Sequence, residues 1–571
     1  LAQGKYLLFL KNDTEVQNNW LEPLVRLIES DDRIGMVGSK LVYPDGRLQE
    51  AGGIIWKDAS GWNYGRLDHP EKPDFNYVKE VDYISGACIM IRADLWKEIG
   101  GFDSRYAPAY YEDADLAFEV RRRGYKVMYQ PQSVVVHFEG ISNGTDLGTG
   151  IKSYQVKNRE KFLEKWSDVL AAYHFPNAEH VFWARDRSRV RKTILVIDHH
   201  VPHYDQDAGS RFTFHYLKLF VEMGFHVVFI GDNFYKHEPY TTTLEQLGIQ
   251  VLYGNWYAGR IKAWLQENGS YIDYVYLNRP HISVKYIDLV KKLTKAKIVY
   301  FGHDLHYLRE LRNYEVEGKK ELLESSNYWK KIEFKLFEEA DVIHTVSSYE
   351  KEIIEKEFPG KVVRHIPLYI YERNFNEDKE FDFDKRKGLL FVGGFNHKPN
   401  VDGVLWFARH VFPEIVSQQP DITFTIVGSN PPEQIQKLHS ERIRVTGYVT
   451  DEELIQFYNN SRMVVVPLRF GAGVKGKVVE AMYHQVPVVT TSIGAEGLVD
   501  IEQYVRIADQ EQDFGTKVLE LYNDKEQWEH LARKSREYII SHFSKEAARE
   551  VIEKDLRPMD VSQVAHLVMS R

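Results

Sequence analysis

Two segments far apart in the chain combine residue types that could do chemistry. In the first, Tyr111-Glu-Asp-Ala-Asp115, carboxylates gather at the start of a predicted helix. In the second, Gly471-Ala-Gly-Val-Lys-Gly-Lys-Val-Val-Glu480, glycines and two lysines precede a carboxylate. Carboxylates can take a proton from a hydroxyl group, and a glycine-rich loop with cations can bind a phosphate. The sequence therefore predicts two sites in one chain.

The first segment has a plain structural interpretation, because acids at a helix N-terminus complement the helix dipole. A functional interpretation is favoured by three neighbouring motifs, which are Gly86 to Arg92, Ile99-Gly-Gly-Phe-Asp103 and Tyr129 to His137. With the acidic segment, they resemble the rhamnosyltransferase-like members of glycosyltransferase family 2, which have the GT-A fold. The resemblance implies inverting sugar transfer, with Asp113 as the base for the acceptor hydroxyl and Glu112 placing the acceptor.

A divalent cation, Mg²⁺ or Mn²⁺, is the cofactor that this resemblance implies at the first site. Family 2 enzymes usually hold it on an Asp-x-Asp element at a strand end, where it neutralises the leaving diphosphate. The matching segment here is Lys11-Asn-Asp13, so Asp13 and His137 are the candidate ligands. For His137, a structural role at a strand end is about equally favoured. The ammonium of Lys11 could instead supply part of the cation's charge.

The beginning of the chain bears on donor binding at the first site. In family 2, the donor's base and ribose bind a βαβ segment that precedes the Asp-x-Asp strand. Here Gly4 to Leu10 already has the pattern of a buried strand entering that motif. We therefore expect a partial GT-A domain that lacks its N-terminal nucleotide-binding part.

The second segment belongs to a longer ordered set of motifs. Two glycines end a predicted strand and open a loop with a lysine, and a further strand lies at Pro487 to Thr490. A glycine-rich loop alone is weak evidence, but the whole set resembles glycosyltransferase family 4, a retaining family with the GT-B fold. That resemblance implies no metal, and it implies that Glu480 holds the donor ribose. The residues that it implies for the donor phosphates are Gly393, Gly394, Lys398, Gly473, Lys475 and Lys477.

The preceding half of such a fold carries the acceptor-side groups. Gly209, Ser210 and Arg211 lie between a predicted strand and helix and resemble the family's glycine loop, although an ordinary connection with a serine cap is the alternative. Tyr300 to Asp304 ends another predicted strand. The resemblance places His303 near the transferred sugar and Asp304 on the acceptor side, and it names no base for the retaining reaction.

Alternating apolar runs and helical stretches predict an α/β fold throughout. We expect a Rossmann-like mixed sheet, followed by a double-Rossmann GT-B module with a cleft between its halves. The predicted divisions are a GT-A domain over 1–150, a closing helix and solvated linker over 151–192, and GT-B halves over 193–380 and 381–571.

Composition narrows the class of protein further. The 571 residues have a net charge of −9, so no nucleic-acid partner is expected, and the single Cys88 excludes an intrachain disulfide. The sequence has no signal peptide and no apolar run long enough for a membrane span, which predicts a cytoplasmic protein. The basic cluster from Arg185 to Lys192 could touch anionic headgroups, which leaves peripheral contact at the inner face of the membrane open.

Three hypotheses follow. The leading one is a bifunctional glycosyltransferase that uses nucleotide-diphosphate sugars to extend a bacterial surface glycan or its lipid-linked precursor. In the second, only the family 4 module is catalytic and the first domain binds the acceptor or docks. In the third, the chain binds nucleotide sugars as a regulator without transfer.

Overall fold

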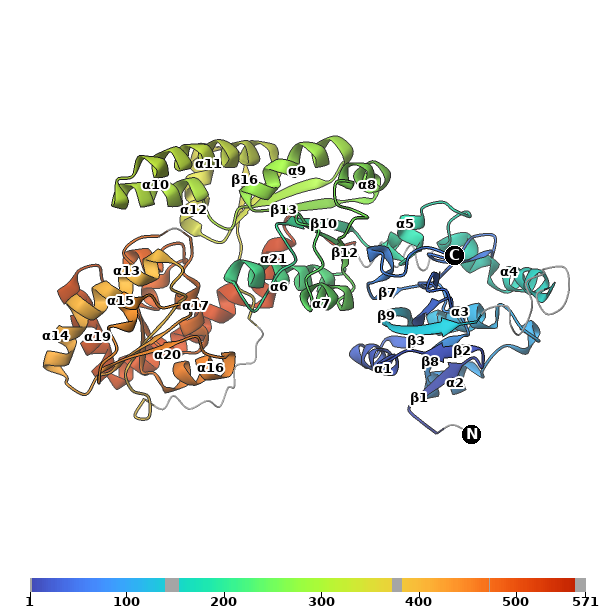
Figure 1. Ribbon diagram of the computed structural model, residues 1–571, viewed down its shortest axis with the longest axis horizontal. Coiled ribbons are helices and arrows are strands. Elements are labelled where there is room, and N and C mark those ends of the chain that lie inside the picture. The colour runs from blue at the N-terminus through green and yellow to red at the C-terminus, as the bar shows by residue number, and fades with distance from the viewer. Residues whose placement is uncertain (1–2, 139–152, 372–382, 472, 560–571) are drawn as a thin grey trace.

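The computed structural model describes residues 3–138, 153–371, 383–471 and 473–559, which form three large sheets in chain order (Figure 1). The predicted α/β class is confirmed. The predicted boundaries at residues 150 and 380 lie outside the described residues.

The first sheet is mixed, with the strand order β1-β8-β3-β9-β2. Strands β3 and β9 run parallel, whereas β1, β8 and β2 are antiparallel to their neighbours. Strand β9 continues through a register shift opposite Ser39 and Lys40 of β3. The strands of this first sheet are β1 (Tyr6–Leu10), β2 (Thr14–Val16), β3 (Ile34–Val42), β4 (Leu48–Glu50), β7 (Lys79–Glu80), β8 (Cys88–Arg92) and β9 (Lys126–His137), while β5 (Gly53–Ile55) and β6 (Gly61–Asn63) form a separate two-stranded sheet. The helices are α1 (Leu21–Ser30), α2 (Ala93–Ile99), α3 (Glu112–Arg122), α4 (Ser153–Tyr173) and α5 (Val181–Ala184).

The second sheet is parallel, with the order β12-β11-β10-β13-β14-β15-β16. Its direction of winding reverses between β10 and β13, which is where ligands bind in doubly wound folds. The strands are β10 (Thr193–Asp198), β11 (His226–Gly231), β12 (Gln250–Leu252), β13 (Tyr274–Asn278), β14 (Lys297–Phe301), β15 (Val342–Thr345) and β16 (Val362–His365). The helices are α6 (Ala208–Glu222), α7 (Tyr240–Gln246), α8 (Ile261–Asn268), α9 (Pro280–Leu293), α10 (His306–Glu317), α11 (Lys320–Glu339) and α12 (Ser348–Glu357).

The third sheet repeats this plan with the order β19-β18-β17-β20-β21-β22, and it reverses between β17 and β20. The strands are β17 (Leu389–Val392), β18 (Phe424–Val427), β19 (Ile443–Gly447), β20 (Met463–Val466), β21 (Val488–Thr490) and β22 (Arg506–Ile507). The helices are α13 (Lys398–Trp406), α14 (Phe412–Gln418), α15 (Glu433–Gln436), α16 (Asp451–Asn460), α17 (Gly476–Tyr483), α18 (Ser492–Ala495), α19 (Glu511–Asn523), α20 (Lys525–Phe543) and α21 (Lys545–Ile552).

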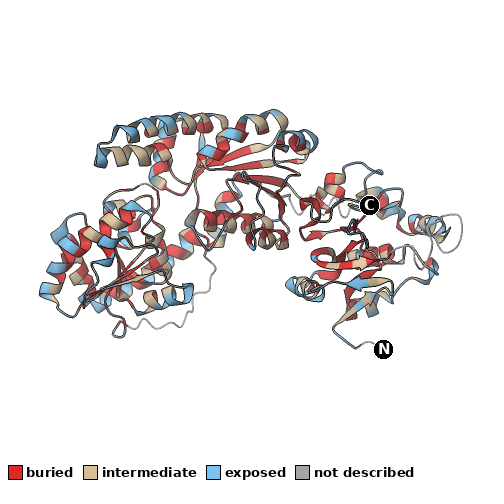
Figure 2. Cartoon of the chain, viewed as in Figure 1, coloured by how far each residue is buried: buried red, intermediate tan, exposed pale blue. Residues whose placement is uncertain are grey.

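Buried residues follow the sheets and the inner faces of their helices, while residues on the outer helix faces are exposed (Figure 2). The last helix, α21, returns from the third sheet to the second: its Ala548 and Ile552 pack in the same core as Phe212 and Val299. The chain thus closes the double-Rossmann module by crossing back between its halves.

The segment predicted as a solvated linker is a buried interface instead. Arg185 is 6% exposed and Asp186 is fully buried. The guanidinium of Arg185 donates to Asp74 in the first domain at 3.0 Å and to Gln250 beside the second sheet at 2.7 Å. The prediction of a solvated linker was wrong at Arg185 and Asp186, because Arg185 is buried between a carboxylate of the first domain and an amide oxygen of the second sheet.

Candidate active sites

Three strand ends of the first sheet bring the predicted metal residues together. Asp13 precedes β2, which pairs with the end of β9 so that Thr14 lies opposite His137. The Nε2 atom of His137 lies 3.5 Å from Oδ1 of Asp13. Between them stands the ammonium of Lys11, whose Nζ is 3.2 Å from Asp13 Oδ2 and 3.2 Å from His137 Nε2.

The two carboxylates predicted for proton transfer lie at the N-terminus of α3. The backbone reaches them through Tyr110 and Tyr111, which both have positive φ angles, of 75° and 73°. The N–H of Gly86 donates to Asp113 at 2.9 Å. Burial first, and then the charge of Asp113, raise the pKa of Glu112 to about 7. Burial also raises the pKa of Asp113, so both carboxyls bind a proton more readily than usual, which suits a general base.

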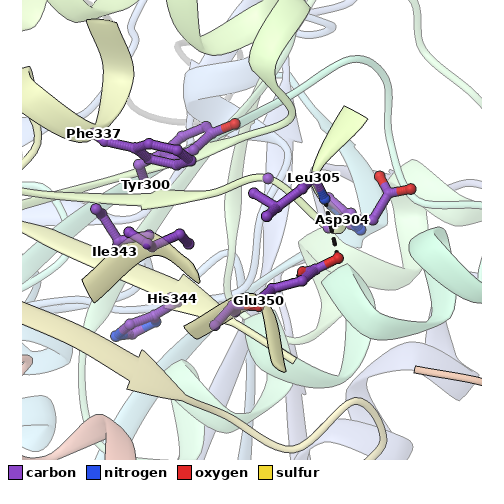
Figure 3. A pocket seen from close by; sticks show the side chains of 11 residues that line it. Tyr300, Asp304, Leu305, Phe337, Ile343, His344 and Glu350 are labelled. Atoms are coloured by element: carbon purple, nitrogen blue, oxygen red, sulfur yellow. Dashed lines mark hydrogen bonds between the residues drawn. The ribbon is translucent and has the colours of Figure 1, made fainter. Parts of the chain in front are cut away.

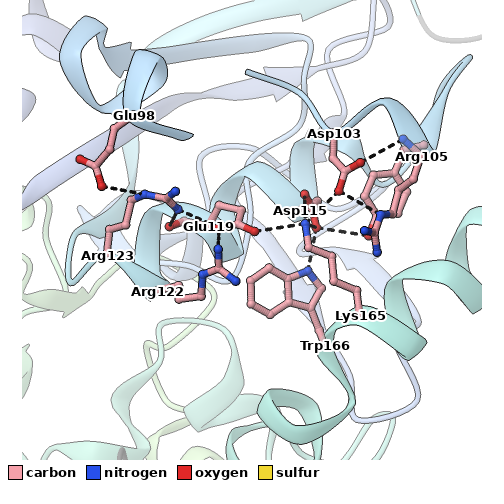
Figure 4. Close-up of polar contacts among 10 residues, drawn as sticks. Glu98, Asp103, Arg105, Asp115, Glu119, Arg122, Arg123, Lys165 and Trp166 are labelled. Carbon is pink, nitrogen blue, oxygen red and sulfur yellow. Dashed lines mark hydrogen bonds and ion pairs between the residues drawn. The ribbon is translucent and has the colours of Figure 1, made fainter. Parts of the chain in front are cut away.

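Asp115, two residues further on, belongs to a network of hydrogen bonds and ion pairs with residues of α4 (Figure 4). It accepts hydrogen bonds from the indole of Trp166 at 2.7 Å and from Lys165 at 2.9 Å, both on α4. Asp103 pairs with the same lysine at 3.1 Å. Of the acidic run, therefore, only Glu112 and Asp113 are available for chemistry.

The residues around Asp13 do not fit a divalent cation well. A cation between Asp13 and His137 would take the place of the Lys11 ammonium, which carries the same sign of charge. Over the described ranges, no group of three or more His, Cys, Asp or Glu side chains is arranged to hold a metal ion. Asp13 and His137, the predicted metal ligands, thus lie close together, but both contact the ammonium of Lys11.

The predicted donor residues meet at the reversal point of the third sheet. Gly393 follows β17, and a Cβ atom added there would lie 2.8 Å from the amide nitrogen of Asn400 and 3.2 Å from Cε of Lys477. Lys477 donates to Asn400 Oδ1 at 2.7 Å, and Asn400 donates to the carbonyl of Gly394 at 2.7 Å. Asn400, which the sequence analysis missed, links the two predicted phosphate loops.

Burial weakens the charges at this edge. It lowers the pKa of Lys475 to about 8, and burial together with Lys475 lowers the pKa of Lys477 to about 7. Burial also raises the pKa of Glu480, against the opposing charge of Arg211. A diphosphate would restore the ammonium charges, so the edge suits an anionic ligand.

The predicted acceptor-side residues lie at the facing edge of the second sheet. His303 follows β14 with a φ of 71°, and burial, then Arg279, lower its pKa to about 3. Its Nε2 is buried without a hydrogen-bond partner within the described part of the chain. A Cβ atom on Gly209 would lie 3.4 Å from His303 Nδ1. A neutral imidazole with an unsatisfied nitrogen here could bond a sugar hydroxyl.

Hydrogen bonds fix the loop that carries Asp304 and Leu305 (Figure 3). Glu350 accepts a hydrogen bond from the N–H of Leu305 at 3.2 Å, and Asp304 itself accepts one from Arg309 at 2.6 Å. The cavity beneath has a volume of about 10 Å³, which is room for roughly one water molecule. These groups hold the loop and leave no space there for a sugar.

The two edges touch across the module. Arg312 of α10 donates to the carbonyl of Gly471 at 2.8 Å and to Glu496 at 2.7 Å. A Cβ atom on Gly473 would lie 3.5 Å from Cβ of Asp304. The glycine-rich donor loop therefore faces the acceptor-side loop directly.

Three residues that were predicted to face a ligand make contacts with other residues of the protein. Lys398 has a side chain that is 76% exposed and pairs with Glu317 at 3.0 Å. Ser210 lies in the first turn of α6 and donates to Asp207 at 2.6 Å, because Asp207, not a serine, caps that helix. Arg211, in the same turn, donates to the carbonyl of Tyr204 at 3.3 Å.

Two family models match separate parts of the chain. Residues 2–152 match the family described as glycosyltransferase like family 2, and residues 386–524 match the family described as glycosyl transferases group 1. The chain therefore carries one segment that matches each of these two glycosyltransferase families. Within the described part of the chain, no helix is long and apolar enough to cross a membrane.

Individual relatives match parts of the chain. The O-antigen biosynthesis protein RfbC of Myxococcus xanthus is 31% identical over 153 residues, which are 25% of this chain and 12% of that protein. The N-acetylglucosaminyl-diphospho-decaprenol L-rhamnosyltransferase of Mycobacterium tuberculosis is 35% identical over 81 residues, 14% of this chain and 24% of that protein. The chain spans 12 to 35% of the length of the first three curated relatives. A solved sucrose-phosphate synthase from Thermosynechococcus elongatus has a TM-score of 0.47 at 15% identity and covers 66% of this chain and 99% of its own.

Proposed function

We propose that the chain transfers sugars from nucleotide-diphosphate donors onto a growing bacterial surface polysaccharide or its lipid-linked precursor, with an inverting first site and a retaining second site. One observation carries the proposal: the glycine-rich loop of the third sheet faces the loop after β14 of the second sheet, where a Cβ atom on Gly473 would lie 3.5 Å from Cβ of Asp304 and Arg312 donates to the carbonyl of Gly471. The names of the two relatives, an O-antigen biosynthesis protein and a rhamnosyltransferase, are consistent with it.

At the second site, the donor diphosphate lies against the turn after β17, where the missing side chain of Gly393 lets Asn400 and Lys477 approach the backbone. Lys477 and Lys475 face its charge, and Glu480 holds the ribose hydroxyls. As the bond from the anomeric carbon to the diphosphate breaks, its electron pair leaves with the phosphate oxygen, and the buried ammonium groups stabilise that oxygen. The acceptor oxygen bonds to the same face of the anomeric carbon, and the hydroxyl proton passes to the departing phosphate oxygen. The neutral imidazole of His303 orients a sugar hydroxyl.

At the first site, the acceptor hydroxyl attacks the anomeric carbon from the face opposite the diphosphate. The oxygen to carbon bond forms while the carbon to phosphate-oxygen bond breaks, and the hydroxyl proton passes to the Glu112 and Asp113 pair. The raised pKa values of these carboxyls suit a group that must accept a proton near pH 7.

A second candidate function is that only the second site transfers sugar, while the first domain binds or docks the acceptor. It is favoured by Lys11 at the position where a metal-binding carboxylate is usual. The two candidates differ in what the loss of the carboxylate pair would do.

Release of nucleotide from a panel of nucleotide sugars, with mixed lipid-linked and oligosaccharide acceptors, separates them. We expect Glu480→Ala to abolish turnover of one donor and Asp113→Asn to lower turnover of another by about 10²-fold or more. If Asp113→Asn has no effect while Glu480→Ala abolishes all release, the second candidate is correct. Unchanged release in both variants would contradict both candidates.

A further inference from the structure

Lys11 occupies the centre of the place where the first site would otherwise hold a cation. Its Nζ lies 3.2 Å from the carboxylate of Asp13 and 3.2 Å from Nε2 of His137. Its backbone N–H is fixed by the carbonyl of Ala87 at 3.0 Å, so the side chain starts from a sheet edge rather than a free loop. The side chain of Asp13 is only 7% exposed and that of His137 only 9%, whereas that of Lys11 is 37% exposed. The ammonium therefore rests on two buried groups and faces outward.

The tautomer of His137 supports the same conclusion. The Nδ1 atom lies 2.9 Å from Oε1 of Gln49, an oxygen that can only accept, so Nδ1 carries the proton. The lone pair is then on Nε2, which is the nitrogen that faces Lys11. A metal would need this lone pair and the carboxylate of Asp13, and the lysine already uses both.

The charge of Lys11 also reaches the proposed base. Lys11 acts to lower the pKa values of both Glu112 and Asp113, against the larger effect of burial. The ammonium thus lies near enough to the carboxylate pair to be in the same site. A diphosphate that leaves on the side opposite the attacking hydroxyl would meet this ammonium.

We propose that Lys11 replaces the divalent cation, so that the first site needs no metal. Asp13 and His137 act as positioning residues that hold the ammonium toward the diphosphate, and Lys11 stabilises the negative charge that the leaving phosphate oxygen gains as the anomeric bond breaks. The proton of the acceptor hydroxyl still goes to the Glu112 and Asp113 pair. This inference deepens the proposed inverting transfer at the first site and rests on it.

Binding of Mn²⁺, followed by electron paramagnetic resonance of the full chain, tests the inference without any turnover. We expect the wild type to show no Mn²⁺ site that depends on Asp13, and Lys11→Asp to bind one Mn²⁺ per chain at least about tenfold more tightly. Adding Asp13→Asn to Lys11→Asp should remove that site. Lys57→Asp, which places the same carboxylate at an exposed lysine of the same domain, is the matched control and should behave as the wild type.

A wild-type Mn²⁺ site that Asp13→Asn removes would overturn the inference, and so would the absence of any gain in folded Lys11→Asp. If Lys11→Asp does not fold, judged by circular dichroism, Lys11→Asn takes its place with the same expected gain. A second readout is turnover of the first-site donor: EDTA should leave the wild type unchanged, and Lys11→Ala should lose about 10² to 10³-fold. If no donor is turned over at the first site, the proposed transfer fails there, but the Mn²⁺ result still decides the role of Lys11.

Discussion

Single buried charges explain how each site is prepared for its ligand. At the second site, Lys477 lies beside Lys475 and donates to Asn400 at 2.7 Å, in surroundings that lower its pKa to about 7. At the first site, one oxygen of Glu112 is buried without a hydrogen-bond partner among the described residues. Burying a lysine or an oxygen without a partner costs folding free energy. Such costs are typical of functional sites, because the bound substrate compensates for them.

Proton uptake on nucleotide binding follows from the lowered pKa of Lys477. At pH 8 the free side chain is mostly neutral, and a bound diphosphate raises its pKa again, so binding should take up a proton. Titration calorimetry with nucleoside diphosphates in two buffers of different ionisation enthalpy measures this uptake. We expect Lys477→Met to remove most of it, while Lys437→Met, at an exposed lysine of the same domain, leaves it unchanged. A heat that is independent of the buffer in the wild type would contradict the prediction.

The raised pKa of Glu112 predicts how stability depends on pH. The folded pKa of about 7 lies above the ordinary value of 4.5. Between these values the unfolded chain is ionised and the folded chain keeps its proton, so folding loses stability as pH rises through this window. Glu112→Gln should therefore stabilise the protein by about 1 to 3 kcal/mol at pH 8 and by little at pH 4.5. Thermal melting at both pH values tests it, with the exposed Glu164→Gln as a control that should show no such difference.

At the scale of elements, the position of α3 depends on α4. Asp115 on α3 is 2% exposed, and it accepts hydrogen bonds from Trp166 and Lys165 of α4 and from Tyr106 at 3.2 Å (Figure 4). Since Glu112 and Asp113 occupy the first turn of the same helix, this network also sets the direction in which the proposed base points.

Loss of one donor in this network should therefore cost stability and activity together. Trp166→Phe keeps an aromatic ring but removes the indole N–H that donates to Asp115 and some packed volume, which should lower the free energy of unfolding of the first domain by about 1 to 3 kcal/mol. Urea denaturation followed by circular dichroism measures it. Lys157→Met, at an exposed position of α4, is the control and should change stability by less than about 0.5 kcal/mol. Equal stability of Trp166→Phe and the wild type would contradict this account of the helix pair.

At the scale of the whole molecule, a buried network joins the first domain to the double-Rossmann module. Asp186 accepts a hydrogen bond from Tyr77 of the first domain at 2.7 Å and lies 2.9 Å from His226 of the second sheet. Arg185 spans the same boundary between Asp74 and Gln250. The N–H of Val78 also donates to the carbonyl of Glu245 at 2.9 Å. The two modules are therefore packed together rather than tethered.

Removing one charge from this network should uncouple the modules. Arg185→Met leaves Asp74 and Asp186 buried without their cation, which should cost about 3 to 5 kcal/mol. In scanning calorimetry, the first domain and the double-Rossmann module of the wild type should unfold in one transition. In the variant they should unfold in two separate transitions. Arg260→Met, at an exposed arginine of the second sheet's domain, should melt as the wild type does. A single unchanged transition in Arg185→Met would contradict the coupling.

The sequence predicted the parts of the molecule that local pattern determines. Apolar runs identified the strands, and the motifs around Asp113 and Lys477 identified the two sites. The pattern could not show that Arg185 would find Asp74, because the two are distant in sequence and meet only in the folded chain. For the same reason, Asn400 and Arg312 were missed, since neither lies in a distinctive motif. Lys11 was noticed as a departure, but its contact with His137 depends on strand pairing.

Diffraction from crystals soaked with a nucleoside diphosphate tests most directly whether the donor binds between the two facing sheet edges. We predict density for the diphosphate against Gly393 and Lys477, with the ribose beside Glu480, and loss of that density in Glu480→Ala crystals soaked in the same way. A nucleotide bound elsewhere on the double-Rossmann module, with the edge between Gly393 and His303 empty, would contradict the account.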